Sequence, residues 1–125
     1  MQFDTDVLIW LLRGNRNAAD KIMSEKDRCI SVITLMELLK GAANKNESTA
    51  IKKLIKKLNF TVIPINDDIS HRSLIYMEEH GLKSGISVAD CLIAATAAES
   101  TQVLCTANHK DFRAIGDIEL EGFKA

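Results

Sequence analysis

Three short apolar runs, separated by longer segments with helical periodicity, constrain the fold of this chain most strongly. The runs cover residues 29–32, 60–63 and 102–105, and a further short run covers residues 2–5. Short runs rich in β-branched and apolar residues are typical of buried strands. Strands that alternate with helices form right-handed crossovers. The pattern therefore predicts an α/β fold, with a mostly parallel central sheet flanked by helices on both faces.

The segments between these runs predict helices with recognisable ends. Residues 47–58 carry apolar side chains on one face and four lysines on the other, as expected for an amphipathic helix. Further helices are expected over residues 6–13, 17–25 and 34–43, from Asp67 or Asp68 to Gly81, and from a Ser87 cap to residue 100. A short last strand is expected near Ile118.

Size and composition favour one globular domain over residues 1–125. Of the 125 residues, 46% are apolar and 26% are charged, which suffices for a core without disulfides. The formal net charge of −1 means that a nucleic-acid partner must be met by a local basic patch. Cys29, Cys91 and Cys105 lack the spacing of zinc ligands, and we interpret them as buried thiols in a reducing compartment.

The N-terminal segment shows no targeting signal. Its apolar run at residues 7–12 is too short for a signal peptide or a membrane span, and no basic segment precedes it. We therefore expect a cytoplasmic protein that does not bind membranes.

Four acidic or amide residues lie where predicted elements begin or end. Asp4, Glu37 and Asn108 follow predicted strands, and Asp90 lies in the first turn of the helix that leads to the last main strand. Ligands of parallel sheets bind beyond the carboxyl ends of the strands, so these residues are expected to converge. Carboxylates gathered among apolar neighbours favour a hard divalent cation as their shared partner.

Each of these acidic residues also has a structural interpretation. Asp4 could cap a helix, although Asp6 is better placed to do so, and Asp6 is expected to cap or to support the site. Glu37 follows Thr34 at the spacing of a capping box, and Asp90 follows Ser87 in the same way. The helix after Asp90 is almost entirely small or apolar, so a carboxylate at its buried start needs a stronger partner.

The segment after the last main strand offers two further oxygen donors. Asn108 and Asp111 could be turn residues, or could supply a neutral and a charged oxygen to a cation. We expect both near the metal, one of them through water, and the sequence leaves open which. Thr106 either hydrogen-bonds to a water at the site or only ends the strand. His71 and His80 are interpreted as solvated residues of a surface helix.

Four motifs in order resemble those of the PIN domain. They are Asp4-Thr5-x-Val7-Leu8-Ile9, Glu37-Leu38-x-x-Gly41, Asp90-x-Leu92-Ile93-Ala94-Ala95 and Thr106-x-Asn108-x-x-Asp111-Phe112. More narrowly, residues 2 to about 120 resemble the VapC-type ribonuclease toxins of VapBC toxin–antitoxin pairs. Each motif is weak alone, and their common order and spacing make the resemblance specific.

The resemblance implies a metal-dependent endoribonuclease toxin. Asp4, Glu37 and Asp90 match the family's acidic positions, and Asn108 and Asp111 match its variable fourth position, so these five residues are the expected catalytic set. Asp4, Glu37, Asp90 and Asp111 would hold one or two Mg²⁺ or Mn²⁺ ions, which suit oxygen ligands. A metal-activated water would then hydrolyse the RNA backbone, leaving a 5′-phosphate and a 3′-hydroxyl.

The resemblance also implies partners. A cognate antitoxin would lay a peptide over a groove near Trp10 and Leu11, and the toxin would form a homodimer. Basic side chains at the rim of the site would bind the RNA. The candidates are Arg13, Lys40, Lys83, Lys110 and Arg113.

Two other functions compete with the nuclease. The sequence Asp4-Thr5-Asp6 resembles the start of a haloacid-dehalogenase-type phosphatase, but no glycine follows Asp6 and the chain is short for that fold. A catalytically weak binding module of the PIN type is the second alternative, because Asn108 replaces a charged oxygen with a neutral one.

Overall fold

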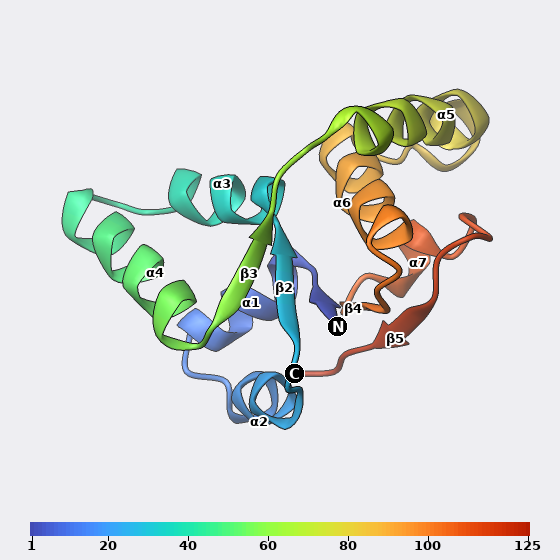
Figure 1. Cartoon of the computed structure of the whole chain (residues 1–125). Coiled ribbons are helices and arrows are strands. Elements are labelled where there is room, and N and C mark those ends of the chain that lie inside the picture. The colour runs from blue at the N-terminus through green and yellow to red at the C-terminus, as the bar shows by residue number, and fades with distance from the viewer.

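All five strands belong to one sheet in the order β3-β2-β1-β4-β5, and the computed structural model describes residues 1–125 (Figure 1). The strands are β1 (Gln2–Phe3), β2 (Arg28–Ser31), β3 (Phe60–Ile63), β4 (Leu104–Thr106) and β5 (Leu120–Gly122). Every neighbouring pair is parallel. The predicted α/β class is confirmed, and the sheet is parallel throughout.

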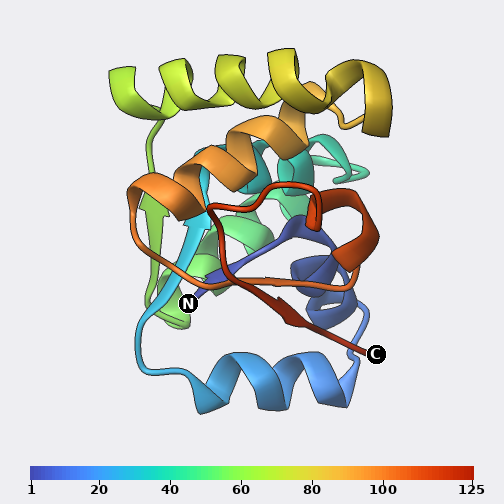
Figure 2. The ribbon, with the colours of Figure 1, turned by 90° about the vertical axis from the view of Figure 1, so that its right-hand side faces the viewer.

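Seven helices connect and cover the strands. They are α1 (Thr5–Leu12), α2 (Arg16–Ser24), α3 (Val32–Lys40), α4 (Lys45–Lys57), α5 (Asp67–Ser84), α6 (Val88–Glu99) and α7 (His109–Phe112). Helices α1, α2 and α4 pack with the sheet in one core cluster, and α5, α6 and α7 pack in a second one. Figure 2 shows α5 outside α6 at one side of the molecule and α2 at the opposite side. The expected helical layers on both faces of the sheet are therefore present.

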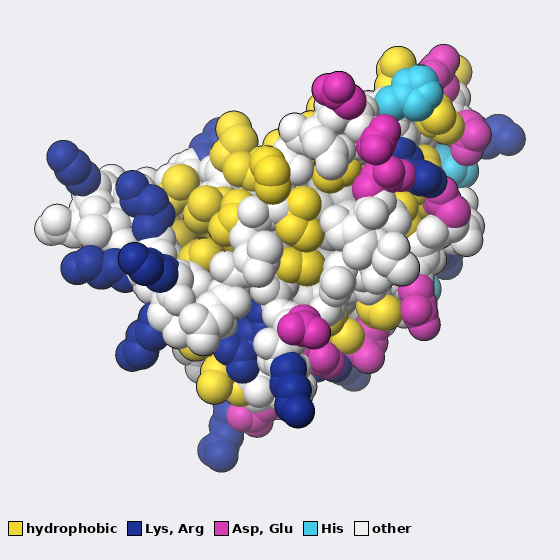
Figure 3. Space-filling model, in the orientation of Figure 1, with side chains coloured by type: hydrophobic (Ala, Val, Ile, Leu, Met, Phe, Trp, Pro, Cys, Tyr) yellow, Lys and Arg dark blue, Asp and Glu magenta, His cyan; other side chains and the backbone are white.

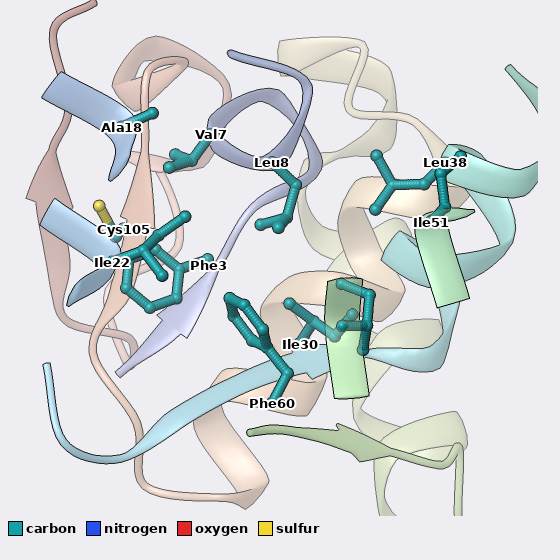
Figure 4. Packing of buried hydrophobic residues seen from close by; sticks show 11 residues of the cluster. Phe3, Val7, Leu8, Ala18, Ile22, Ile30, Leu38, Ile51, Phe60 and Cys105 are labelled. Carbon is teal, nitrogen blue, oxygen red and sulfur yellow. The ribbon is translucent and has the colours of Figure 1, made fainter. Parts of the chain in front are cut away.

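Two phenylalanines anchor the first core cluster (Figure 4). The rings of Phe3 on β1 and Phe60 on β3 meet edge to face, with centroids 5.9 Å apart and an interplanar angle of 80°. Such a pair contributes about 1 kcal/mol beyond the area that it buries. Ile30 of the intervening β2 is fully buried in the same cluster, and the short strand β1 pairs with β2 on one side and with β4 on the other. This matters because β1 leads directly into the acidic residues.

Helix α6 forms the centre of the second core cluster, as its composition predicts. Six of its residues are buried, namely Cys91, Ile93, Ala94, Ala95, Thr96 and Ala97. Ser87 caps the helix, and this prediction is confirmed by the hydrogen bond from the Asp90 backbone N–H to Ser87 Oγ. The three cysteines are free and buried, in agreement with their interpretation as core residues. None of the helices combines the length and the apolar character required to cross a membrane.

The predicted end of α5 at Gly81 is wrong. The helix continues to Ser84 and stops at Gly85, whose φ of 66° is the left-handed conformation that glycine adopts at helix ends. The predicted cap at Asp67 or Asp68 is also wrong, because Asn66 accepts a hydrogen bond from the Ile69 N–H and caps the helix. Gly81 lies inside the helix, where a Cβ would come within 2.6 Å of Met77 Sδ unless that flexible side chain moved.

Candidate functional site

Asp4 is the buried centre of the candidate site, at the carboxyl end of β1. Only 5% of its surface is exposed. Its Oδ1 accepts a hydrogen bond of 2.8 Å from the Thr5 backbone N–H, and its Oδ2 accepts one of 2.7 Å from Thr106 Oγ1. Asp4 is also the N-cap of α1, so the prediction that Asp6 caps this helix is wrong. The helix begins one residue earlier than its sequence pattern indicates.

The environment of Asp4 opposes its negative charge. Burial is the main reason that its pKa rises to about 7, and the nearby charges of Asp6 and Asp90 add to this rise. The hydrogen bonds from Thr106 and Thr5 act in the opposite direction, because they stabilise the ionised form. A positive charge near this carboxyl would favour its ionised form.

Asp6 lies in the first turn of α1 and contacts the loop after β4. Its Oδ2 accepts a hydrogen bond of 3.1 Å from the Ala107 backbone N–H. Its Oδ1 is buried without any hydrogen-bond partner. Burial raises the pKa of this carboxyl as well. Asp6 therefore ties α1 to the loop that leads into α7, and keeps one oxygen free beside Asp4.

Glu37 lies in the second turn of α3, and the predicted capping box with Thr34 is wrong. Helix α3 begins at Val32, with Ser31 as its cap, so Thr34 is inside the helix and fully buried. The Glu37 side chain is exposed and reaches toward α1, where its Oε1 accepts a hydrogen bond of 2.7 Å from Thr5 Oγ1. This places a carboxylate of α3 next to the start of α1.

Asp90 is half-buried in the first turn of α6, as predicted. Burial is the main cause of the rise in its pKa, and the negative charges of Asp111, Glu37 and Asp6 raise it further. These carboxylates come from α1, α3, α6 and α7. All the others therefore lie near enough to Asp90 to act on it, at the carboxyl edge of the sheet where the sequence predicts convergence; this group of side chains with Asp4 is called the pocket below.

Asn108 and Asp111 are both exposed at α7. The Asn108 backbone N–H donates a hydrogen bond of 2.9 Å to Thr106 Oγ1, and its side chain makes no capping hydrogen bond. Asp111 is the residue whose charge acts on Asp90. The charge of Asp111 thus reaches Asp90, and which of Asp111 and Asn108 would contact a metal stays a prediction. Thr106 does more than end the strand, because it hydrogen-bonds to Asp4 directly.

The chemistry of this pocket suits a hard divalent cation. All of its donors are carboxylate, amide or hydroxyl oxygens, which Mg²⁺ and Mn²⁺ prefer. The buried Asp4 and the unpaired oxygen of Asp6 gain most from a positive charge. No three histidine, cysteine, aspartate or glutamate side chains stand close enough together to hold an ion in this arrangement.

Sequence reasoning missed two residues of this pocket, Thr5 and Thr34. Their hydroxyl groups share a hydrogen bond of 3.0 Å, and Thr5 connects this pair to Glu37. A signal was present in the sequence: Thr5 directly follows Asp4, and Thr34 lies three residues before Glu37, on the same face of a helix.

Arg13 lies at the opposite end of α1, about 12 Å from its start along the helix axis. Its guanidinium carbon lies 5.5 Å from the centre of the Trp10 ring, and Trp10 packs partly buried against the core. Arg13 also lines an apolar groove of about 700 Å³ between α1 and α4, together with Ile9, Leu12, Gly41, Ala42, Glu47, Ala50, Ile51 and Leu54. A role of Arg13 in RNA binding stays a prediction.

The predicted surface helix that carries His71 and His80 is α5. His71 is exposed, but His80 is partly buried, and both line a polar hollow of about 660 Å³ with Arg72, Tyr76, Glu99 and Asp117. This hollow lies between α5, the end of α6 and residues 114–117, and it contains none of the predicted site residues.

Comparison with known proteins identifies relatives of this chain. Residues 1–118 match the model of the PIN domain. Ribonuclease VapC1 of Rickettsia felis is 34% identical, over 94% of this chain and 91% of the relative. A toxin–antitoxin complex from Klebsiella pneumoniae contains a chain with a TM-score of 0.79 and 31% identity, covering 94% of this chain and 93% of that one. VapBC-1 from nontypeable Haemophilus influenzae gives a TM-score of 0.78 at 27% identity, over 97% and 96% of the two chains.

Proposed function

We propose that this chain, which belongs to the PIN-domain family, is a VapC-type ribonuclease and the toxin of a type II toxin–antitoxin pair. The observation that carries this proposal is the group of carboxylates from α1, α3 and α7 whose charges act on Asp90 of α6, together with the buried Asp4, on which Asp6 and Asp90 act. The phosphatase alternative is abandoned, because the family match covers residues 1–118. Residues 1–125 would form one domain, acting in the cytoplasm.

Four carboxylates would hold the metal, namely those of Asp4, Glu37, Asp90 and Asp111. A bound Mg²⁺ or Mn²⁺ would activate a water and stabilise the charge that develops on the phosphodiester. Among these four, Asp4 and Asp90 have raised pKa values, so a cation would stabilise their ionised forms most. Asn108 adds only a neutral oxygen, so we favour one tightly held ion and a weaker second one.

The remaining side chains hold the carboxylates in place. Thr106 donates to Asp4 Oδ2 and accepts the Asn108 N–H, so it sets one face of the pocket. Asp6 fixes the loop that carries Asn108 through its bond to the Ala107 N–H. The catalytic set would thus be Asp4, Glu37, Asp90, Asn108 and Asp111, supported by Thr106 and Asp6.

RNA is the proposed substrate, bound through its phosphates by basic side chains near the pocket. Lys110 and Arg113 lie within and directly after α7 and are exposed, next to Asp111 in the sequence. Lys40 ends α3, the helix that carries Glu37. Lys83, near the end of α5, completes the proposed rim, whereas Arg13 lies at the far end of α1, away from the pocket. Most remaining lysines face elsewhere: Figure 3 shows Lys and Arg side chains gathered over α4, and Asp and Glu gathered over α5.

The antitoxin is the proposed protein partner, and the groove between α1 and α4 would receive its apolar segment. Six of the nine residues that line this groove are hydrophobic. Ile9 and Leu12 expose 37% and 43% of their surface there, which is unusual for large apolar side chains unless a partner covers them. Arg13 at its edge would pair with an acidic group of that segment.

A second copy of this chain is proposed to cover the apolar surface between α5 and α6. Leu74 and Val88 expose 57% and 68% of their surface. They line a hollow of about 240 Å³ with Met77, Cys91 and Leu92, next to Asp90 in α6. A Val88→Glu substitution should give a monomer in analytical ultracentrifugation, whereas the same change at the distant exposed Met23 should not.

The ribonuclease is tested with purified protein and total RNA. Cleavage in Mg²⁺, its loss in EDTA and its loss in Asp90→Asn are expected, with 5′-phosphate ends on the products. A growth assay separates the nuclease from a binding module. Expression of the wild-type protein alone should stop growth, and expression of Asp90→Asn should not. An equally harmless wild-type protein that leaves RNA intact would favour the binding module.

A further inference from the structure

The side chain of Glu37 is exposed, yet the structure holds it toward the pocket through a single hydroxyl group. A glutamate on a helix surface ordinarily samples several rotamers. Here its Oε1 accepts a hydrogen bond of 2.7 Å from Thr5 Oγ1, on a different helix. No other hydrogen bond or ion pair of the Glu37 carboxylate is present, so Thr5 alone determines its direction.

The single hydroxyl proton of Thr5 can be donated to only one of its two hydrogen-bond partners. A threonine hydroxyl carries one proton and an ionised carboxylate only accepts, so Thr5 donates to Glu37. It must then accept from the Thr34 hydroxyl, which lies 3.0 Å away. Thr34 is fully buried and Thr5 is 9% exposed, so water has little access to the hydrogen bond between the two hydroxyl groups, whereas the Glu37 carboxylate at the end of the chain is exposed. Each bond in such a chain strengthens the next.

Thr5 also orients Asp4, but through its backbone. The Thr5 N–H donates to Asp4 Oδ1 at 2.8 Å. One residue therefore aligns two carboxylates by two separate groups. A substitution of the side chain removes only the bond to Glu37 and leaves the bond to Asp4 in place.

We propose that Thr5 and Thr34 are positioning residues, which fix one oxygen of Glu37 and leave the other directed at the divalent ion. This inference rests on the proposed metal-dependent nuclease. In this proposal the two hydroxyl groups hold the Glu37 carboxylate in one orientation, which an exposed glutamate would otherwise lack. Both threonines act through Glu37 in this proposal, and bind neither the ion nor the RNA themselves.

The test compares Thr5→Val, Thr5→Ser and Thr34→Val, with Thr61→Val of the exposed edge strand β3 as the matched control. Mn²⁺ affinity is measured by calorimetry, and RNA cleavage is measured across a series of Mg²⁺ concentrations. Thr5→Val should weaken Mn²⁺ binding roughly 10-fold, within the range known for residues that orient metal ligands. The half-saturating Mg²⁺ concentration should rise equally, and the rate at saturating Mg²⁺ should recover.

Thr5→Ser keeps the hydroxyl and should match the wild type, as should Thr61→Val. Thr34→Val should show a smaller loss than Thr5→Val, and it tests the chain independently if Thr5→Val does not fold. Unchanged Mn²⁺ affinity in both valine variants, beside a wild type that binds and cleaves, overturns only the positioning role. A wild type that neither binds Mn²⁺ nor cleaves RNA overturns the proposed nuclease, and this inference with it.

Discussion

Thr106 Oγ1 lies 2.7 Å from Asp4 Oδ2, so a residue of β4 orients the buried carboxylate at the end of β1. The same oxygen accepts the Asn108 N–H at 2.9 Å. One hydroxyl thus links the first acidic motif of the chain to the last one, which lies a hundred residues further on. The link explains how such a short strand as β1 can place its carboxylate accurately.

A Thr106→Val substitution should disturb both groups that the hydroxyl serves. It leaves the Asn108 N–H and Asp4 Oδ2 without their partner, which costs roughly 1–3 kcal/mol of unfolding free energy. RNA cleavage should fall as well, because Asp4 is no longer held. Urea unfolding and a cleavage assay check this, with Thr106→Ser as the control that keeps both bonds. Equal stability of Thr106→Val and the wild type would show that the hydroxyl is not needed.

Removal of a carboxylate from the pocket should abolish cleavage and leave the fold intact. Asp4→Ala, Glu37→Ala and Asp90→Ala should each reduce the rate more than roughly 100-fold, since even residues that only orient ligands cost 10- to 100-fold. Circular dichroism should match that of the wild type. Asp20→Ala, at an exposed position of α2, is the matched control. Full Mg²⁺-dependent activity in Asp90→Ala would refute the mechanism.

Stability of the metal-free protein should fall as the pH rises. The pKa of Asp4 is about 7 in the folded protein and 3.8 in the unfolded chain. Between these values the folded protein binds a proton that the unfolded chain has released, so each increase in pH favours unfolding. The full shift corresponds to roughly 4 kcal/mol. The pKa values of Asp6 and Asp90 are also raised in the folded protein, so these two groups likewise make it less stable as the pH rises.

Urea unfolding in EDTA at pH 5 and pH 8 measures this effect. Asp4→Asn carries no ionisable group, so it should be more stable than the wild type at pH 8 and should lose most of the pH dependence. Added Mg²⁺ should stabilise the wild type more at pH 8 than at pH 5, because protons compete with the cation. An identical pH slope in Asp4→Asn and the wild type would contradict the assignment.

An ion-pair network lies far from the pocket, so its removal should lower stability without lowering activity. Arg72 of α5 binds Glu99 of α6 and Asp117, and the Tyr76 hydroxyl donates to Asp117 at 2.8 Å. Arg72→Leu should cost about 1 kcal/mol, because these groups are partly exposed and screened. The cleavage rate of the folded protein should not change. A thermal melt and a cleavage assay below the melting temperature test both expectations.

Local signals predicted several elements of the fold correctly. Strand β3 has the predicted bounds, and α6 begins after the predicted Ser87 cap, because the signals for both lie within a few adjacent residues. The start of α3 was missed. Ser31 stands within a β-branched run that continues into the helix, so the boundary depends on its hydrogen bond to the Ile33 N–H.

The candidate site was predictable only in part, for the same reason. Asp4 and Asp90 stand out because their neighbours are apolar, and the structure places both in the pocket. Glu37, considered by itself, resembled half of a capping box. Its real partner, Thr5, belongs to another helix, and no pattern along the chain reveals a hydrogen bond between α1 and α3.

Crystals of the wild-type protein soaked in Mn²⁺ test the central claim most directly, because anomalous scattering locates the ion without assumptions. The predicted result is a peak bound by oxygens of Asp4 and Asp90, with Glu37 and Asp111 beside it, and no such peak in Asp90→Asn. A protein that cleaves RNA in Mn²⁺ but shows no peak in this pocket, or a peak elsewhere, would contradict the assignment of the site.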